Sequence, residues 1–423
     1  MRLFFAPIVA LRVIKITKYM REIMAINWVC YFLGTPLFLI FNSLECMRWI
    51  KKYWKHIIAF SLPIQVLVVQ WLASDPESLE RWYTYGFYGW LSKTLRLMFG
   101  FMPFAFGQIV FYTLVFLATY WFLRQVWKRI RKKITWKKFL SSVALHGLFG
   151  VSLFYFLFMV FWGLNYHRPS IIKAVKLEVK KISPQELEQM CDRLIELTNA
   201  SRDAVTEDTT KAIQFKMNHR QMREEAVKGY ENFAKVFPQY QYEYWSVKSV
   251  FVPQLMSLFG NGGIYFPFTG EANVNMDMPD FLLPATICHE MAHQIGIASE
   301  TEANYMAYMT TQYHPSPVFQ YSGNVLAVRY AMSALSYTDS TAFKRLRKKL
   351  SPGFLHDLRA NRKYWDQFQN PLEPLSRAFY DLFLKANSQR EGIKSYGLMI
   401  HLIMGEFRKN GLRYEVEKDV KQE

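Results

Sequence analysis

Long apolar stretches constrain this sequence most, because a bilayer accepts only segments that satisfy their own backbone hydrogen bonds. Three of them approach or exceed the 20 or so residues that a helix needs to cross a membrane, at residues 56–73, 103–123 and 139–163. A fourth, residues 24–44, is interrupted by Asn27, Gly34, Pro36 and Asn42, and it leaves open a span, a re-entrant segment or a signal-like anchor. We therefore predict three transmembrane helices, or four if this stretch also crosses.

Basic residues predict how these helices are oriented, since Lys and Arg collect in cytoplasmic loops. Three lysines, at positions 51, 52 and 55, precede the first stretch, and eight Lys and Arg lie in the loop between the second and third. With both flanks in the cytoplasm, three crossings place the rest of the chain outside. The predicted parts are an N-terminal extension, a membrane region and an extracytoplasmic domain, at residues 1–50, 51–163 and 164–423.

The net charge of +18 does not indicate nucleic-acid binding, because of where it lies. Residues 1–163 carry a net +15 and residues 164–423 only +3. A soluble nucleic-acid reader would carry the basic excess on its folded domain. We expect residues 1–163 to contact the lipid bilayer, and we expect no nucleic-acid partner. The four cysteines are scattered and predict no disulfide framework.

Residues 164–423 are predicted to be mainly helical with a small sheet. Ser183, Pro184 and Glu186 form a helix start, and a second helix is expected at 219–236. Residues 244–252 suit a strand, and residues 320–350 and 373–408 suit helices. Before this domain, the aromatic segment from Asp75 to Phe101 suits a helix on the outer membrane surface.

The sequence His289-Glu290-Met291-Ala292-His293 carries the chemistry. Pro284 suits the start of a helix here and Gly296 its end. On that helix the two histidines are one turn apart, so both imidazoles project from one face and can bind Zn²⁺. Glu290 is rotated about 100° from His289, where it can act on water without binding the metal. We predict Glu290 as the general base of metal-assisted hydrolysis.

A catalytic zinc site needs a third protein ligand. Glu300 is predicted to be that ligand and Glu302 is the alternate, although Glu302 also suits a capping box with Ser299. Asn304, one turn after Glu300, is expected to hydrogen-bond a histidine ligand. A metzincin site would require histidine where Ser299 stands, so that class is not expected.

The segment before the site alternates like a strand, and Pro267 restricts it to a sheet edge. Such an edge can hold an extended peptide by backbone pairing, or simply pack on the helix. The predicted substrate rim is Tyr265, Phe266, Phe268 and Glu271. Candidates for stabilising an oxyanion are Tyr305, Tyr308, Tyr321 and His314, and the sequence does not choose among them.

Six runs of residues carry a resemblance: FWGLNY (161–166), FPFTGEAN (266–273), CHEMAHQ (288–294), EANY (302–305), YDLFLKAN (380–387) and GIKSY (392–396). Together they resemble a bacterial membrane family known as domain of unknown function 3810. The resemblance implies a zinc peptidase of unknown substrate in the bacterial cytoplasmic (inner) membrane, and it does not choose between Glu300 and Glu302.

The sequence thus predicts a multi-pass, membrane-anchored enzyme with a zincin-like α+β domain that hydrolyses a peptide or protein substrate. One alternative is a non-catalytic membrane scaffold with structural zinc, which would need a closed fourth ligand such as Cys288 or Glu302. Another is a transporter, which would place charged residues inside the spans. The apolar stretches contain almost none, so this alternative is disfavoured.

Overall fold

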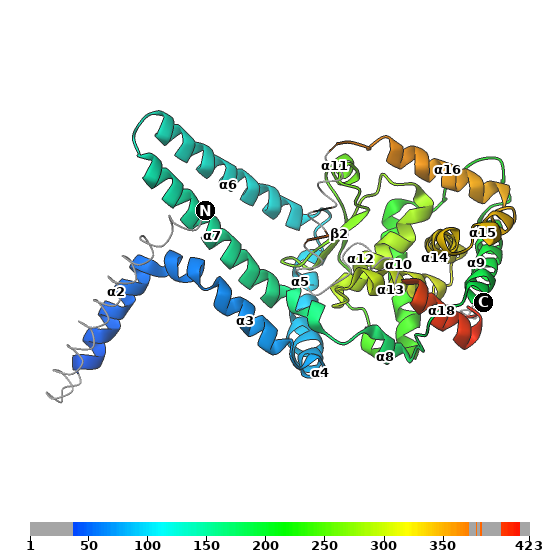
Figure 1. The fold of residues 1–423 in the computed structure, drawn as a ribbon, viewed down its shortest axis with the longest axis horizontal. Coiled ribbons are helices and arrows are strands. Elements are labelled where there is room, and N and C mark those ends of the chain that lie inside the picture. The colour runs from blue at the N-terminus through cyan, green and yellow to red at the C-terminus, as the bar shows by residue number, and fades with distance from the viewer. Residues whose placement is uncertain (1–36, 372–377, 379–380, 383–398, 415–423) are drawn as a thin grey trace. The chain divides into compact units, whose positions relative to one another are not determined.

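The computed structural model describes residues 37–371, 378, 381–382 and 399–414. By packing, the chain forms two units, one of Met1–Leu62 with Leu140–Leu153 and the other of Pro63–Phe139 with Phe154–Glu423. Most described residues are helical (Figure 1). The predicted fourth stretch, 24–44, and much of the predicted helix 373–408 lie outside the described residues.

Two described helices are long and apolar enough to cross a membrane, α6 (Phe106–Ile130) and α7 (Trp136–Phe161). They correspond to the predicted second and third stretches. The predicted first stretch is broken, with α2 (Leu37–Phe60) ending before Ser61 and α3 (Leu62–Leu72) following it. Pro63 explains the break, because proline lacks the N–H that would continue the helix and its ring disfavours helical backbone before it. A third crossing exists only if the two pieces cross together.

The smaller unit is held together by contacts between α2 and the middle of α7. The hydroxyl of Ser152 donates to the carbonyl of Ile58 at 2.5 Å. The rings of Trp54 and Phe149 meet edge to face, with centroids 5.3 Å apart. Polar contacts of Ser152 and an aromatic contact therefore support the pairing of these helices.

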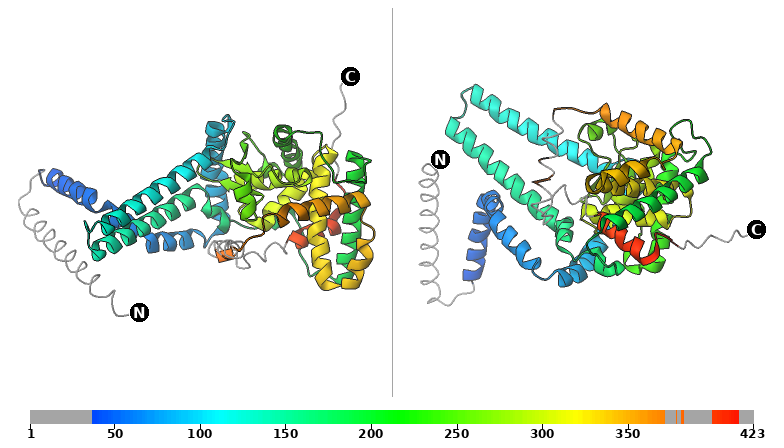
Figure 2. Two further views of the ribbon diagram at one scale, coloured as in Figure 1. Left: turned by 90° about the horizontal axis from the view of Figure 1, so that it is seen from above. Right: turned by 45° about the vertical axis from the view of Figure 1, so that its right-hand side comes forward.

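The larger unit contains the remaining elements, which Figures 1 and 2 show from three directions. Those before the sheet are α4 (Pro76–Leu79), the π-helix η1 (Glu80–Tyr88), α5 (Gly89–Gly100), η2 (Gly163–His167), α8 (Ile171–Val175), α9 (Pro184–Val205), α10 (His219–Val236) and η3 (Pro238–Tyr240). Those within and after it are α11 (Pro253–Leu258), η4 (Asp280–Leu282), α12 (Leu283–Gln294), α13 (Glu300–Gln312), α14 (Pro317–Thr338), α15 (Ser340–Arg347), α16 (Pro352–Asp366) and α18 (Met399–Asn410).

The sheet has three short strands in the order β1-β3-β2. Strand β1 (Val247–Ser249) pairs in parallel with β3 (Glu271–Val274), and β2 (Gly263–Phe266) pairs antiparallel on the other side. The predicted edge strand is confirmed, since β2 lies at the edge and ends just before Pro267. The predicted strand 244–252 is shorter than expected, at three residues.

The core of the larger unit surrounds α13, every residue of which is buried. Helix α12 packs against α13, and α14 packs against α13 and α9. The predicted helix starting at Ser183 is confirmed with a complete capping box, and the helix 219–236 is confirmed as α10. The predicted helix 320–350 is divided because Asp339 caps a new helix, α15. This packing brings the first residue of α13 beside the last two turns of α12.

Candidate metal centre

Helix α12 presents two histidines on one face. Pro284 lies in its first turn, and Gly296 follows its end at φ +87°, a backbone conformation that favours glycine. The rings of His289 and His293 lie edge to face with centroids 4.8 Å apart. The predicted one-turn geometry therefore brings both imidazoles together.

Glu300, the first residue of α13, completes a group of three ligand atoms that all lie within 4.8 Å of one another. Its carboxylate oxygens lie 3.2 Å from Nε2 of His289 and 3.7 Å from Nε2 of His293. Bonds of about 2.0–2.1 Å to a tetrahedral zinc ion would separate two ligand atoms by about 3.3 Å. The two distances bracket that separation, so the three donors fit a zinc ion.

The second nitrogen of each ring is already engaged. Nδ1 of His289 lies 3.1 Å from Oδ1 of Asn304, and Nδ1 of His293 lies 2.6 Å from the carbonyl oxygen of Ile297. Both partners are acceptors, so each neutral ring can donate from Nδ1 and leave the lone pair of Nε2 for a metal ion. This is the tautomer that a metal-binding histidine requires. Asn304 thus has the contact that was predicted for it.

Glu290 lies next to the three donors and is only 4% exposed. Its Oε2 is buried without a hydrogen-bond partner among the described atoms. Its carboxylate lies against Gly263 at the start of β2. A Cβ atom added to Gly263 would lie 2.4 Å from Oε1 of Glu290. The missing side chain of Gly263 makes room for Glu290. A buried carboxylate without a partner lowers the stability of the fold unless it is protonated or binds a cation.

Burial and neighbouring charges shift the pKa values of these groups. Burial raises the pKa of Glu290 to about 8 and lowers that of His293 to about 4. Burial also opposes protonation of His289, but the hydrogen bond and charge of Glu300 outweigh it and raise the pKa of that ring. A bound divalent cation would oppose each of these protonated forms.

The alternate ligand, Glu302, lies elsewhere. Its Oε1 accepts a hydrogen bond from the backbone N–H of Ile171 at 3.1 Å, at the start of α8. The capping box with Ser299 does not form, because the Ser299 side chain makes no capping bond. Cys288 is fully buried, and burial raises the pKa of its thiol to about 12. Neither residue belongs to the group of donors found among the described residues.

The predicted substrate rim is only partly at an open surface. Tyr265 is buried, with its hydroxyl 3.2 Å from that of Tyr88. Glu271 is also buried, and it accepts hydrogen bonds from the backbone N–H groups of Phe106 and Gly107 at 2.9 and 2.5 Å. These two residues are therefore not rim residues, and Glu271 instead caps the N-terminus of α6.

The aromatic pair of that predicted rim also packs inward in part. Phe268 contacts the rings of Phe154 and Phe161 in α7, at centroid distances of 6.1 and 5.5 Å. Phe266 packs against Phe268 at 5.7 Å. The outward side chain of β2 is Ile264, which is half exposed. The open edge of the strand beside Glu290 therefore lies at Gly263 and Ile264.

The predicted oxyanion candidates are engaged elsewhere. The hydroxyl of Tyr305 donates to Glu406 at 2.7 Å, and that of Tyr321 donates to Asp357. Tyr308 packs against Tyr414, and His314 stacks on Phe319. None of these partners is a metal-centre residue.

Two tyrosines that the sequence analysis did not select lie near Glu300 instead. Burial raises the pKa of Tyr166, and the charge of Glu300 raises it further. Burial raises the pKa of Tyr330 to about 12, and Glu300 again contributes while Arg329 opposes it. The Tyr330 hydroxyl also lies 3.5 Å from Nδ2 of Asn304. Tyr166 lay within a motif of the family resemblance, whereas no pattern indicated Tyr330.

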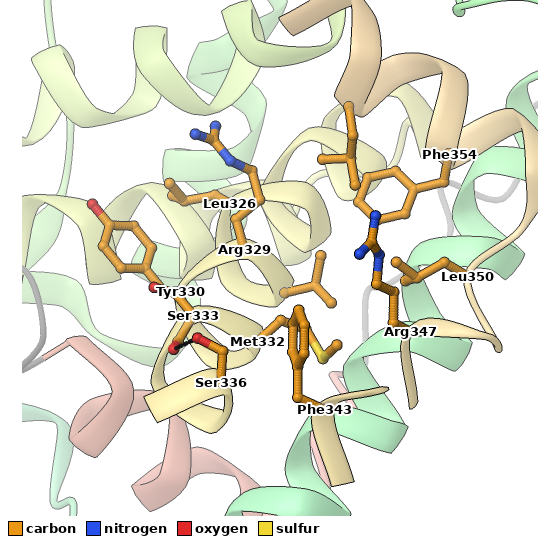
Figure 3. A pocket seen from close by; sticks show the side chains of 12 residues that line it. Leu326, Arg329, Tyr330, Met332, Ser333, Ser336, Phe343, Arg347, Leu350 and Phe354 are labelled. Atoms are coloured by element: carbon orange, nitrogen blue, oxygen red, sulfur yellow. Dashed lines mark hydrogen bonds between the residues drawn. The ribbon is translucent and has the colours of Figure 1, made fainter. Parts of the chain in front are cut away.

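Tyr330 also lines a cavity of about 580 Å³ between α14, α15 and α16. Figure 3 shows that the other side chains lining this cavity are mostly apolar, and that Arg329 and Arg347 are its charged members. The phenol ring of Tyr330 lies on the opposite side from Arg347 and Phe354 in this view. His289, His293 and Glu300 are not among the residues that line this cavity.

The C-terminal end of α12 is held by helices that lie earlier in the chain. The last carbonyls of a helix have no partner within it. The Gln294 carbonyl accepts from Ser92 Oγ at 2.6 Å and from Arg96 Nη1 at 2.9 Å, and the Tyr88 hydroxyl lies 3.0 Å away. The His293 carbonyl accepts from Trp162 Nε1 at 3.2 Å. Helix α12, which carries the two histidines, is thus anchored by η1, α5 and the end of α7.

The family assignment comes from comparison of the whole chain. The sequence matches the model of a family described as "Protein of unknown function (DUF3810)" over residues 83–404. The chain belongs to this family. No curated protein and no solved structure matches the chain. The match includes the metal centre and the helices that anchor α12, and the resemblance inferred from the motifs is confirmed.

Proposed function

We propose that this family member is a membrane-bound, zinc-dependent peptidase. The observation that carries the proposal is the set of three donors, His289, His293 and Glu300, whose ligand atoms lie within 4.8 Å of one another and whose imidazoles each have an acceptor beside Nδ1. Three protein ligands leave the fourth position open, which is typical of catalytic rather than structural zinc.

Zinc bound there would supply Lewis-acid activation of water and of a peptide carbonyl. Glu290 is the proton carrier, because its partnerless oxygen is buried beside the donors. It takes a proton from the attacking water and passes it to the nitrogen of the leaving amine. Tyr330 and Tyr166, whose pKa values both respond to Glu300, are the candidates for stabilising the negative charge on the carbonyl oxygen.

The proposed substrate is a peptide in extended conformation. Strand β2 has an unpaired edge, and its first residue, Gly263, touches the Glu290 side chain. A substrate strand paired with this edge would pass Glu290 with its backbone aligned. The same strand geometry gives the enzyme a way to hold sequence-diverse substrates through main-chain hydrogen bonds.

Topology forms the second part of the proposal. The basic residues between α6 and α7 support a cytoplasmic position for that loop, and the proposed position of the metal centre is then the outer side of a bacterial inner membrane. The alternative of a non-catalytic zinc scaffold has less support, because neither Cys288 nor Glu302 reaches the metal donors. It would also leave the buried Glu290 carboxylate without a function.

The test uses the full-length protein purified in detergent, with zinc content and peptidase activity both measured. Wild type and Glu290→Gln should each bind one zinc ion per chain, and only wild type should cleave peptides. Glu300→Ala should lose zinc, whereas the matched control Glu302→Gln should keep it. A Glu290→Gln variant as active as wild type would refute the proposed chemistry. Zinc retained by Glu300→Ala would refute the ligand set.

A further inference from the structure

One segment of the larger unit combines a lack of charge with exposed apolar side chains. Residues 249–270 contain no Lys, Arg, Asp or Glu. Within this segment five large apolar side chains are 39% exposed or more: Phe251, Val252, Leu255, Phe259 and Ile264. Scattered single apolar residues are ordinary on a protein surface, but a run of them without any charge indicates an interaction surface.

Both ends of this segment are tied to the first turn of α6. At its start, the backbone N–H of Phe251 donates to Oε1 of Gln108 at 2.8 Å, and the Phe251 ring stacks on Phe104 with centroids 6.4 Å apart. Just after its end, Glu271 caps the helix through the N–H groups of Phe106 and Gly107. The segment therefore lies at the level at which α6 begins.

The start of α6 is the level at which this helix would enter the bilayer. The helix runs for 25 residues, and only 6% of its most apolar stretch is buried inside the protein. A helix that faces lipid would have this exposure. The end of α5 reaches the same level and also exposes apolar side chains, among them Leu97, Met98 and Phe101. The uncharged segment thus continues the lipid-facing surface of α6 rather than forming an isolated patch.

We infer that residues 251–264, which include the short helix α11, form a membrane-surface segment that inserts its apolar side chains at the boundary between lipid head groups and acyl chains. The segment ends at Ile264 in the edge strand β2, directly after Gly263, which touches Glu290. The substrate-binding edge is then held at the bilayer surface. The substrate class is a membrane-anchored protein whose cleaved segment lies next to the bilayer. This substrate class rests on the proposed peptidase function, whereas the lipid contact rests only on α6 crossing the membrane.

The lipid contact is tested with a fluorescent bimane label at position 255. The label is attached to Leu255→Cys in a Cys30→Ser, Cys46→Ser background, because Cys191 and Cys288 are fully buried. The matched control is Tyr337→Cys, at a side chain that is 91% exposed on α14. Both proteins are placed in phosphatidylcholine nanodiscs, with or without lipids that carry a nitroxide quencher near the head group.

Position 255 should be quenched several-fold more than position 337 by the shallow quencher. Equal, weak quenching at both positions would overturn the inference. Short spin–spin distances between two copies that carry a nitroxide label on Leu255→Cys, together with weak lipid quenching of the bimane, would also overturn it by assigning the surface to self-association.

A second experiment tests the substrate class. The same peptide is offered with and without a lipid anchor, and the anchored form should be cleaved at least several-fold faster. Leu255→Glu should remove this preference and keep its zinc, while Tyr337→Glu should change neither. An equal preference in Leu255→Glu and wild type would refute the assignment of the substrate class. Absence of any cleavage by zinc-loaded wild type would instead refute the peptidase function, with the quenching result unaffected.

Discussion

Replacing Gly263 with alanine should move the proposed general base without touching the metal ligands. A Cβ atom at this position would lie 2.4 Å from Oε1 of Glu290 and 2.6 Å from both Cγ and Cδ. Because non-bonded carbon contacts prefer about 3.5 Å or more, the carboxylate must move by about 1 Å. A misplacement of that size can lower the rate by about 10²-fold, which corresponds to about 2.7 kcal/mol of transition-state stabilisation.

The assay is kcat/KM for peptide cleavage by the full-length enzyme, measured together with bound zinc. We expect Gly263→Ala to lose about two orders of magnitude in kcat/KM while it keeps one zinc ion per chain. Gly150→Ala is the control, since nothing lies within 4 Å of a Cβ atom there. Wild-type activity in Gly263→Ala would refute the placement of Glu290, and a loss of zinc would show that the substitution disturbs the ligands instead.

Three further changes test other parts of the site. Asn304→Ala removes the acceptor for Nδ1 of His289, so zinc affinity in a competition titration should fall about 10–100-fold. For zinc-free protein, the thermal midpoint should fall as pH rises from 6.5 to 8, because Glu290 holds a proton in the folded state up to pH 8 but in the unfolded chain only to about 4.5. The lowered pKa of His293 makes the thermal midpoint rise with pH, but only below pH 6.5. Glu290→Gln should flatten the fall of the thermal midpoint between pH 6.5 and 8. Glu271→Ala leaves the first N–H groups of α6 without their cap, and it should lower the thermal midpoint by several degrees without changing zinc content.

The grouping of the two histidines on one helix was predictable from the sequence because their geometry is local. Two histidines four residues apart must share a face of any α-helix, and Pro284 and Gly296 mark its limits. Glu300 was preferred over Glu302 because residues 300–304 resemble the Glu-x-x-Ala-Asn pattern from which many HExxH enzymes take a metal-binding glutamate. The same local rules gave the capping box at Ser183 and the edge position of β2, since capping and proline effects act over only a few residues.

Residues that act across long distances in sequence could not be predicted in this way. Glu271 is 164 residues from Gly107, and only the fold shows that its carboxylate caps a membrane helix rather than facing a substrate. Tyr330 reaches Asn304 from a different helix. The oxyanion candidates were chosen by closeness in sequence to the motif, but packing of α13 in the core directs Tyr305 and Tyr308 away from the metal centre.

The residues that hold the end of α12 lie within the family match. The match starts at residue 83, more than 200 residues before His289. Tyr83 itself donates a hydrogen bond to backbone carbonyls at the end of α7, at 3.0–3.1 Å. Tyr88, Ser92 and Arg96 then satisfy the end of α12. A helix end buried without such partners would be unstable, so η1 and α5 are part of the framework that holds the candidate metal centre.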